Sequence, residues 1–243
     1  MARFKITIQY DGTNFFGWQF QPEKRTVQDE LEKVISTFSD GEKIKVFGAG
    51  RTDTGVHALS QVAHFDLNTD LDTCNLIKAL NAHLSEDILV ESLDVVPADF
   101  HARYSAQIRY YRYQCYTGNN VLFRNQSWIT GQLDQSILQS VAETVVGEHD
   151  FLSFCKFRID MKSTVCKIYE SVWKKQDKML IYYVSGNRFL HHMVRYLTGT
   201  MVEISRGRFT IESFLNLLNN PEKNVQIFKA PPQGLILEKV DYA

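Results

Sequence analysis

The chain has 243 residues, a hydrophobic fraction of 44% and a formal net charge of −1. This length allows one large domain or two of about 120 residues, and the hydrophobic content argues against a disordered chain. No apolar run approaches the roughly 18 residues that span a bilayer, and no signal-peptide block follows Met1, so we expect a cytoplasmic protein without a membrane segment.

The first hundred residues alternate between strand and helix patterns. Residues 3–10 alternate apolar and polar side chains, which predicts a half-buried strand. Acids and apolar residues at helical spacing follow Thr26, which predicts a helix that begins after a Thr26 cap. Further patterns predict strands over 43–47, 61–65 and 88–96 and a helix over 72–84.

The second half of the chain repeats this theme without detectable sequence repetition. Its patterns predict strands over 107–116, 165–174, 179–185 and 235–240, and helices over 134–146, 188–204 and 211–218. The alternation predicts an α+β fold of two α/β halves, residues 1–103 and 104–243. No low-complexity linker separates the halves, so we expect them to pack together with a cleft between them.

The net charge and the cysteines limit the choice of partner and cofactor. A net charge of −1 argues against a nucleic-acid partner, yet residues 66–99 hold eight acids against one base and residues 100–133 hold four arginines and no acid. Such an asymmetry is compatible with binding a polyanion, although imbalances of this size are common. The four cysteines are widely spaced and form no C-x-x-C pair, which predicts reduced, mostly buried thiols and no zinc or redox centre: Cys74, Cys115, Cys155 and Cys166.

A loop with three glycines, residues 48–58, carries Asp53 two positions after Arg51. Glycine lets the backbone approach a ligand closely, and a neighbouring arginine keeps a carboxylate ionised. No metal-ligand spacing surrounds Asp53, so we expect a nucleophile or a base. A purely structural turn is the alternative, because Asp and Thr are common turn formers. The triplet Asp53-Thr54-Gly55 also occurs in aspartic proteases, but it lacks the preceding apolar strand and we interpret it as coincidence.

Two further constellations stand in the second half. In the strand over 107–116, Arg109, Tyr111 and Tyr113 share one face, which would stack bases and neutralise phosphates if exposed. A tyrosine-rich core strand is the alternative. In the helix over 188–204, His191 and Arg195 share a face. The adjacent His191 and His192 would diverge by about 100° on a helix, so we expect no metal site there and expect Arg195 to reach a carboxylate or phosphate.

Seven segments, in the same order, give the chain a resemblance to the bacterial tRNA pseudouridine synthase A family over almost its whole length. They are Tyr10-Asp11-Gly12-Thr13 with Phe16-Gly17-Trp18-Gln19, residues 49–58, Phe100-His101-Ala102-Arg103, residues 109–113, residues 147–151, residues 187–195, and Gly234-Leu235 with Val240-Asp241-Tyr242. The resemblance implies the pseudouridine synthase fold, with a central mixed, mainly antiparallel sheet. It also implies isomerisation of uridine to pseudouridine in the anticodon stem-loop of tRNA, at positions 38–40, without a cofactor or a metal. The family is dimeric, with tRNA lying across both subunits, so the resemblance implies a homodimer.

The resemblance also assigns roles to single residues. Asp53 would be the nucleophile after base flipping, attacking C6 of uracil or C1′ of ribose or driving glycal formation; these routes stay open. Tyr111 would stack on the flipped uracil and take up the C5 proton, and Arg195 would pair with Asp53.

Three other residues would bind substrate. Arg51 would occupy the space that the base vacates, Leu235 would line the pocket, and Arg109 would contact the RNA. Ile236 stands where many members carry tyrosine, and the loop over 156–162 is either an RNA contact or a solvated surface loop. The alternative function is an RNA-binding module of the same fold that no longer catalyses.

Overall fold

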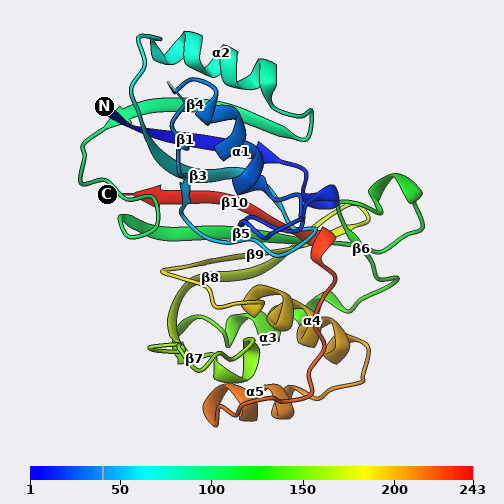
Figure 1. The fold of residues 1–243 in the computed structure, drawn as a ribbon. Coiled ribbons are helices and arrows are strands. Elements are labelled where there is room, and N and C mark those ends of the chain that lie inside the picture. Colours follow the sequence, from blue (N-terminus) through cyan, green and yellow to red (C-terminus); the bar gives the residue numbers. More distant parts are fainter. Residues whose placement is uncertain (40, 243) are drawn as a thin grey trace. The chain divides into compact units, whose positions relative to one another are not determined.

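The computed structural model describes residues 1–39 and 41–242. The chain forms two compact units, Met1–Gln107 with Leu237–Ala243, and Ile108–Ile236. Each unit combines strands and helices (Figure 1). The segment Leu237–Ala243 thus groups with the first unit. The two contiguous halves predicted from the sequence, 1–103 and 104–243, do not include this long-range association.

Over its described residues, the first unit is a sheet with two α-helices. In it, β1 pairs antiparallel with both β3 and β4, and the strand order is β4-β1-β3-β10. Its elements are β1 (Ala2–Tyr10), α1 (Val27–Ser36), β2 (Phe47–Gly48), β3 (His57–Leu67), α2 (Thr73–His83), β4 (Ile88–Val96) and most of β10 (Leu235–Tyr242).

Strand alternation and helix caps build this unit as predicted. Every second side chain of β1 from Phe4 to Tyr10 is buried, while the intervening ones are half-buried. The Thr26 hydroxyl accepts a hydrogen bond from the amide of Asp29, so α1 begins at the predicted cap. The structure adds a cap for α2, where the Asp72 carboxylate accepts a hydrogen bond from the amide of Asn75. In Figure 1, α2 lies beside β4, against which it packs. The buried residues of α1 include Val27, Leu31 and Ile35.

The strand predicted over 43–47 is wrong for most of its length, because only Phe47–Gly48 pairs with a neighbouring strand. The amide of Ile44 donates to Ser36 Oγ at 2.9 Å and the amide of Val46 donates to Glu32 Oε1 at 3.1 Å. Side chains of α1 therefore satisfy these backbone groups in place of a sheet ladder. The apolar residues Ile44 and Val46 are nevertheless buried.

The second unit is a sheet of order β5-β9-β8-β7 with three helices. Strands β5, β9, β8 and β7 pair antiparallel, whereas the short β6 runs parallel to the end of β5. Its elements are β5 (Ala106–Tyr116), β6 (Trp128–Ile129), α3 (Gln135–Glu143), β7 (Gly147–Asp150), β8 (Val165–Gln176), β9 (Met179–Gly186), α4 (Met193–Ser205) and α5 (Ile211–Asn219).

Every second side chain of the tyrosine strand β5 from Tyr111 to Cys115 lies in the core of this unit. Tyr111, Tyr113 and Cys115 are buried, and the Tyr113 hydroxyl donates to the carbonyl of Pro231 at 2.7 Å. The predicted alternation is confirmed, but an exposed stacking face that includes Tyr113 is wrong. The core-strand alternative describes Tyr113, because its ring is fully enclosed and burial raises the pKa of its hydroxyl well above the usual range.

The α+β class with a mixed, mainly antiparallel sheet is confirmed. All four cysteines are free thiols, of which Cys115 and Cys166 are buried and Cys74 is exposed. Burial raises the pKa of the Cys166 thiol to about 11, which keeps it protonated at neutral pH. Among the described residues, no helix has the length and apolarity that a membrane crossing requires.

Candidate active site

The Asp53 loop lies in the first unit, between β2 and β3. Thr52 is buried, Asp53 is half-buried and Arg51 is exposed. The amide of Val56 donates to the Asp53 carbonyl at 3.1 Å, which closes a tight turn, and Gly55 within that turn has a φ of 77°. The loop therefore contains a glycine where the backbone requires the left-handed region, and it leaves both charged side chains accessible to solvent.

Residues 12–18 form a cradle behind this loop. The Thr52 carbonyl accepts a hydrogen bond from the amide of Trp18 at 3.1 Å, and the amide of Gly55 donates to the carbonyl of Phe15 at 3.2 Å. Two segments that are far apart in sequence are thus joined backbone to backbone. The loop keeps its shape through these bonds and not through its own turn alone.

Two glycines make this close approach possible. A Cβ on Gly12 would lie 2.0 Å from the carbonyl oxygen of Val56, and a Cβ on Gly17 would lie 2.6 Å from that of Thr52. Both contacts are with backbone, which cannot rotate out of the way, and Gly17 also has a φ of 87°. The glycines at these two positions are therefore a steric requirement of the cradle.

Two buried side chains form hydrogen bonds with the loop. The Tyr10 hydroxyl lies 2.8 Å from Thr52 Oγ1, and Gln61 Nε2 donates to the Gly50 carbonyl at 3.0 Å. Neither residue is among the site residues predicted from the sequence. A polar glutamine within the apolar stretch of β3 is the one signal that could have identified Gln61, because a buried amide needs a partner.

Tyr111 is one of four predicted site residues that fall in the second unit. It lies in the middle of β5 opposite Val184 of β9, and only 9% of its surface is exposed. The edge of its ring meets Phe189, with ring centroids 5.1 Å apart. Phe189 therefore restricts how the Tyr111 ring can turn, and sequence reasoning did not single it out.

Arg195 lies in the first turn of α4, and here the predicted helix over 188–204 is wrong at its start. The helix begins at Met193, and His192 before it has a φ of 66°, so residues 188–192 are not helical. His191 and Arg195 consequently do not share a helix face. The divergence argument against a shared metal also fails, because the rings of His191 and His192 lie 3.9 Å apart.

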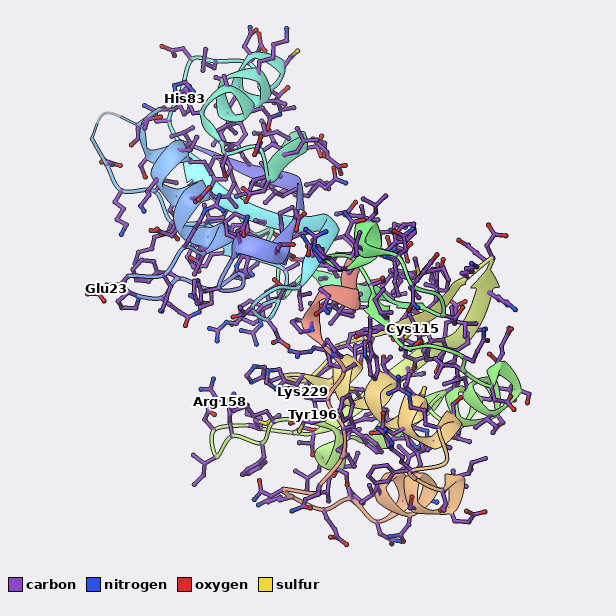
Figure 2. All side chains as sticks on the ribbon, turned by 90° about the vertical axis from the view of Figure 1, so that its right-hand side faces the viewer. Glu23, His83, Cys115, Arg158, Tyr196 and Lys229 are labelled. Carbon is purple, nitrogen blue, oxygen red and sulfur yellow. The ribbon has the colours of Figure 1, made fainter. Side chains whose placement is uncertain are left out.

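The Arg195 side chain is 7% exposed and is held by the segment that precedes β10. Its Nε donates to the Ala230 carbonyl at 2.8 Å, and the Ala230 amide donates back to the Arg195 carbonyl at 3.0 Å. Lys229, next to Ala230, lies near Tyr196 of α4 in Figure 2, with its ammonium 6.0 Å from the centre of the Tyr196 ring. The two hydrogen bonds between Arg195 and Ala230 fix the direction of the Arg195 guanidinium.

Arg109 and Leu235 are placed by other contacts in the second unit. Arg109 Nη1 donates to the carbonyl of Asn187 at 2.7 Å, so this arginine lies at the start of the 187–192 segment. Leu235 is 6% exposed and follows Gly234, where a Cβ would lie 2.6 Å from the Tyr113 ring. The Gly234-Leu235 segment therefore packs directly on the tyrosine strand.

The loop over 156–162 is a surface loop in the second unit. Ile159 is almost fully exposed, and Arg158 forms an exposed ion pair with Asp160 at 2.9 Å. Figure 2 shows Arg158 extending away from the ribbon. The Lys223 ammonium lies 4.2 Å from the centre of the Phe157 ring. This cation–π pair connects the loop to the rest of its unit.

The chain matches a known protein family along most of its length. A family model described as tRNA pseudouridine synthase covers residues 6–105 and 141–243. The tRNA pseudouridine synthase A of Geobacillus sp. (strain WCH70) is 40% identical over 243 residues, which cover 99% of this chain and 98% of that protein. The protein of the same name from Dictyoglomus turgidum is 42% identical and is matched in full by the whole of this chain. The resemblance seen in the seven segments is thus confirmed, and the chain belongs to the tRNA pseudouridine synthase A family.

Proposed function

We propose that this chain isomerises uridine to pseudouridine in the anticodon stem-loop of tRNA, at positions 38–40, with Asp53 as the nucleophile. Family membership carries this proposal. The structure adds support, because the Asp53 loop is held by residues on both sides while Asp53 itself stays half-buried and reachable. The target base must leave its stack to meet such a group, which costs a few kcal/mol.

Asp53 begins the reaction by one of three routes, by attack at C6 of uracil, by attack at C1′ of ribose, or by promoting a glycal. In each, the bond from C1′ to N1 breaks and a bond from C1′ to C5 forms. The C5 proton leaves and N1 gains a proton, so atoms balance without a cofactor or a metal. We assign removal of the C5 proton to the Tyr111 hydroxyl, on a ring that Phe189 restrains.

The arginines and Leu235 complete the assignment. Arg195 keeps the Asp53 carboxylate ionised and oriented, a role suited to a guanidinium that Ala230 already holds. Arg51 fills the space that the flipped base leaves, which its exposure allows. Arg109 binds the RNA backbone, and Leu235 lines the base pocket. Tyr111 and Arg109 lie outside the residues that the family model matches but inside the alignments with the two relatives.

We further propose that the protein acts in the cytoplasm as a homodimer with tRNA across both subunits. The dimer would supply a longer RNA-binding surface than a chain of net charge −1 provides alone. Its mass in solution, measured by light scattering with and without tRNA, tests this assembly.

Release of tritium from tRNA labelled at uridine C5 tests the reaction. Isomerisation replaces the C5–H bond, so the wild-type chain should release label to water while Asp53→Asn releases none and still binds tRNA. A matched transcript with cytidine in place of the anticodon-arm uridines should release none with either protein. Turnover by Asp53→Asn at the wild-type rate would contradict the role of Asp53. Tight binding without release by the wild-type chain would favour the inactive RNA-binding module.

A further inference from the structure

Tyr10 is the last residue of β1 and its ring is buried, with 3% of its surface exposed. Its hydroxyl lies 2.8 Å from Thr52 Oγ1, and Thr52 directly precedes Asp53. A phenylalanine would fill the same space in the core without bringing a polar atom with it. Because a buried hydroxyl is unfavourable unless it is bonded, the Tyr10 hydroxyl is explained by its contact with Thr52.

Thr52 is held at its backbone as well as at its side chain. Its carbonyl accepts from the amide of Trp18 at 3.1 Å, and a Cβ on Gly17 would lie 2.6 Å from that carbonyl oxygen and 3.1 Å from the carbonyl carbon of Asp53. The Tyr10 bond removes the remaining freedom, since it selects one rotamer of the Thr52 side chain. With both ends of Thr52 held, the peptide plane that leads into Asp53 has one orientation.

We propose that Tyr10 is a positioning residue for Asp53, acting through Thr52. Tyr10 is 3% exposed, so we assign it no direct contact with substrate. The inference rests on the proposed role of Asp53 and adds to it the group that sets the direction of the carboxylate. A small displacement of a reacting group lowers the rate of the chemical step more than it lowers the affinity for substrate.

A double-mutant cycle tests this coupling. Tyr10→Phe and Thr52→Val each remove one hydroxyl and keep the shape of the side chain. Each should lower kcat for tritium release by about 10- to 100-fold, with the Kd for tRNA within about twofold of wild type. The double variant should be no slower than the slower single variant, because both changes break the same bond. Thr52→Ser, which keeps the hydroxyl, should recover most of the kcat that Thr52→Val loses.

The second unit provides a matched control. The Tyr182 hydroxyl lies 2.8 Å from Ser171 Oγ, and both side chains are buried. Tyr182→Phe therefore removes the same kind of bond at a site that the proposed reaction does not use. We expect both tyrosine variants to lower Tm to a similar extent and only Tyr10→Phe to lower kcat.

Three results would overturn the inference. They are a wild-type kcat in Tyr10→Phe, an equal loss of kcat in Tyr182→Phe, and additive losses in the double variant. Should Tyr10→Phe fail to fold, the comparison of Thr52→Val with Thr52→Ser decides the matter alone. Failure of the proposed function is distinct, since it requires an inactive wild-type chain or an active Asp53→Asn variant.

Discussion

His64 illustrates how burial and neighbouring charges lower the pKa of a single residue. Its Nδ1 accepts a hydrogen bond from the amide of Ala102 at 3.1 Å, and the rings of Phe47 and His101 lie against it, with centroids 5.1 and 4.6 Å away. Burial, followed by the neighbouring His101 and Arg3, lowers the pKa of His64 to about 4. The imidazole is therefore neutral at physiological pH and acts as a hydrogen-bond acceptor within the first unit.

This lowered pKa predicts a pH-dependent stability. Between about pH 6.5 and pH 4 the unfolded chain binds a proton at His64 and the folded chain does not. The contribution of neutral His64 is fully present above about pH 6.5 and is lost as the pH falls through about 4. His64→Asn keeps an acceptor for the Ala102 amide but does not titrate. The free energy of unfolding in urea should therefore depend less steeply on pH in the variant, within this window alone. Parallel curves for the two proteins would contradict the assignment.

At the scale of elements, α4 is the most enclosed helix of the second unit. All but one of the residues from Met193 to Ile204 are buried, and Tyr196 is the exception. The segment over 228–230 runs against this helix, with a Cβ on Gly199 placed 2.2 Å from the carbonyl oxygen of Phe228. The position of this helix, and hence that of Arg195, depends on backbone contact at a glycine.

Gly199→Ala has two opposite effects on the free energy of unfolding. Helix propensity alone would favour alanine by about 1 kcal/mol. The added Cβ would overlap a backbone carbonyl, and forced overlaps in packed cores cost about 1–3 kcal/mol or more. We expect the overlap to dominate and the variant to unfold at a lower denaturant concentration. Ser140→Ala, at an exposed position of α3, is the propensity control and should leave the midpoint unchanged or slightly raised. A Gly199→Ala midpoint at or above wild type would show that the 228–230 segment yields.

At the scale of the whole molecule, the chain completes its first unit with its last residues. The Tyr242 hydroxyl donates to the carbonyl of Ala102 at 2.7 Å, and its ring lies 5.1 Å from that of Phe100. Leu237 and Val240 are buried. Figure 1 shows both chain ends in this unit, where the end of β10 lies beside β3. The first unit therefore needs a strand segment that follows the whole of the second unit in sequence.

A chain that stops at Ile236 tests this dependence. It loses the C-terminal strand residues of the first unit and keeps the whole of the second. Hydrogen exchange should then become faster in β3 and in residues 100–105, because their partners are gone. Peptides from β8 and α3 provide the internal control and should exchange as in the full chain. Unchanged protection in β3 would mean that the first unit folds without its last strand.

Much of the fold was predictable because the relevant signals are local. The alternation of β1, the cap at Thr26 and the period of α1 operate within a few residues, and both of these elements are present where they were predicted. The strand over 43–46 and the start of α4 were not predictable in the same way. Side chains of α1, 8 and 14 residues away, satisfy the amides of Ile44 and Val46 in place of a neighbouring strand. A residue in the left-handed region, His192, delays the start of α4.

The sequence by itself determined the element pattern, the glycine-rich Asp53 loop and, through its seven segments, the family. Only the tertiary structure decided what holds that loop, since Tyr10, Gly12 and Gly17 meet it across some forty residues of chain. It also decided that Tyr113 is core and that the last strand belongs to the first unit. The physical reason is range: periodicity and capping depend on near neighbours, whereas steric fit and buried hydrogen bonds depend on which distant segments meet.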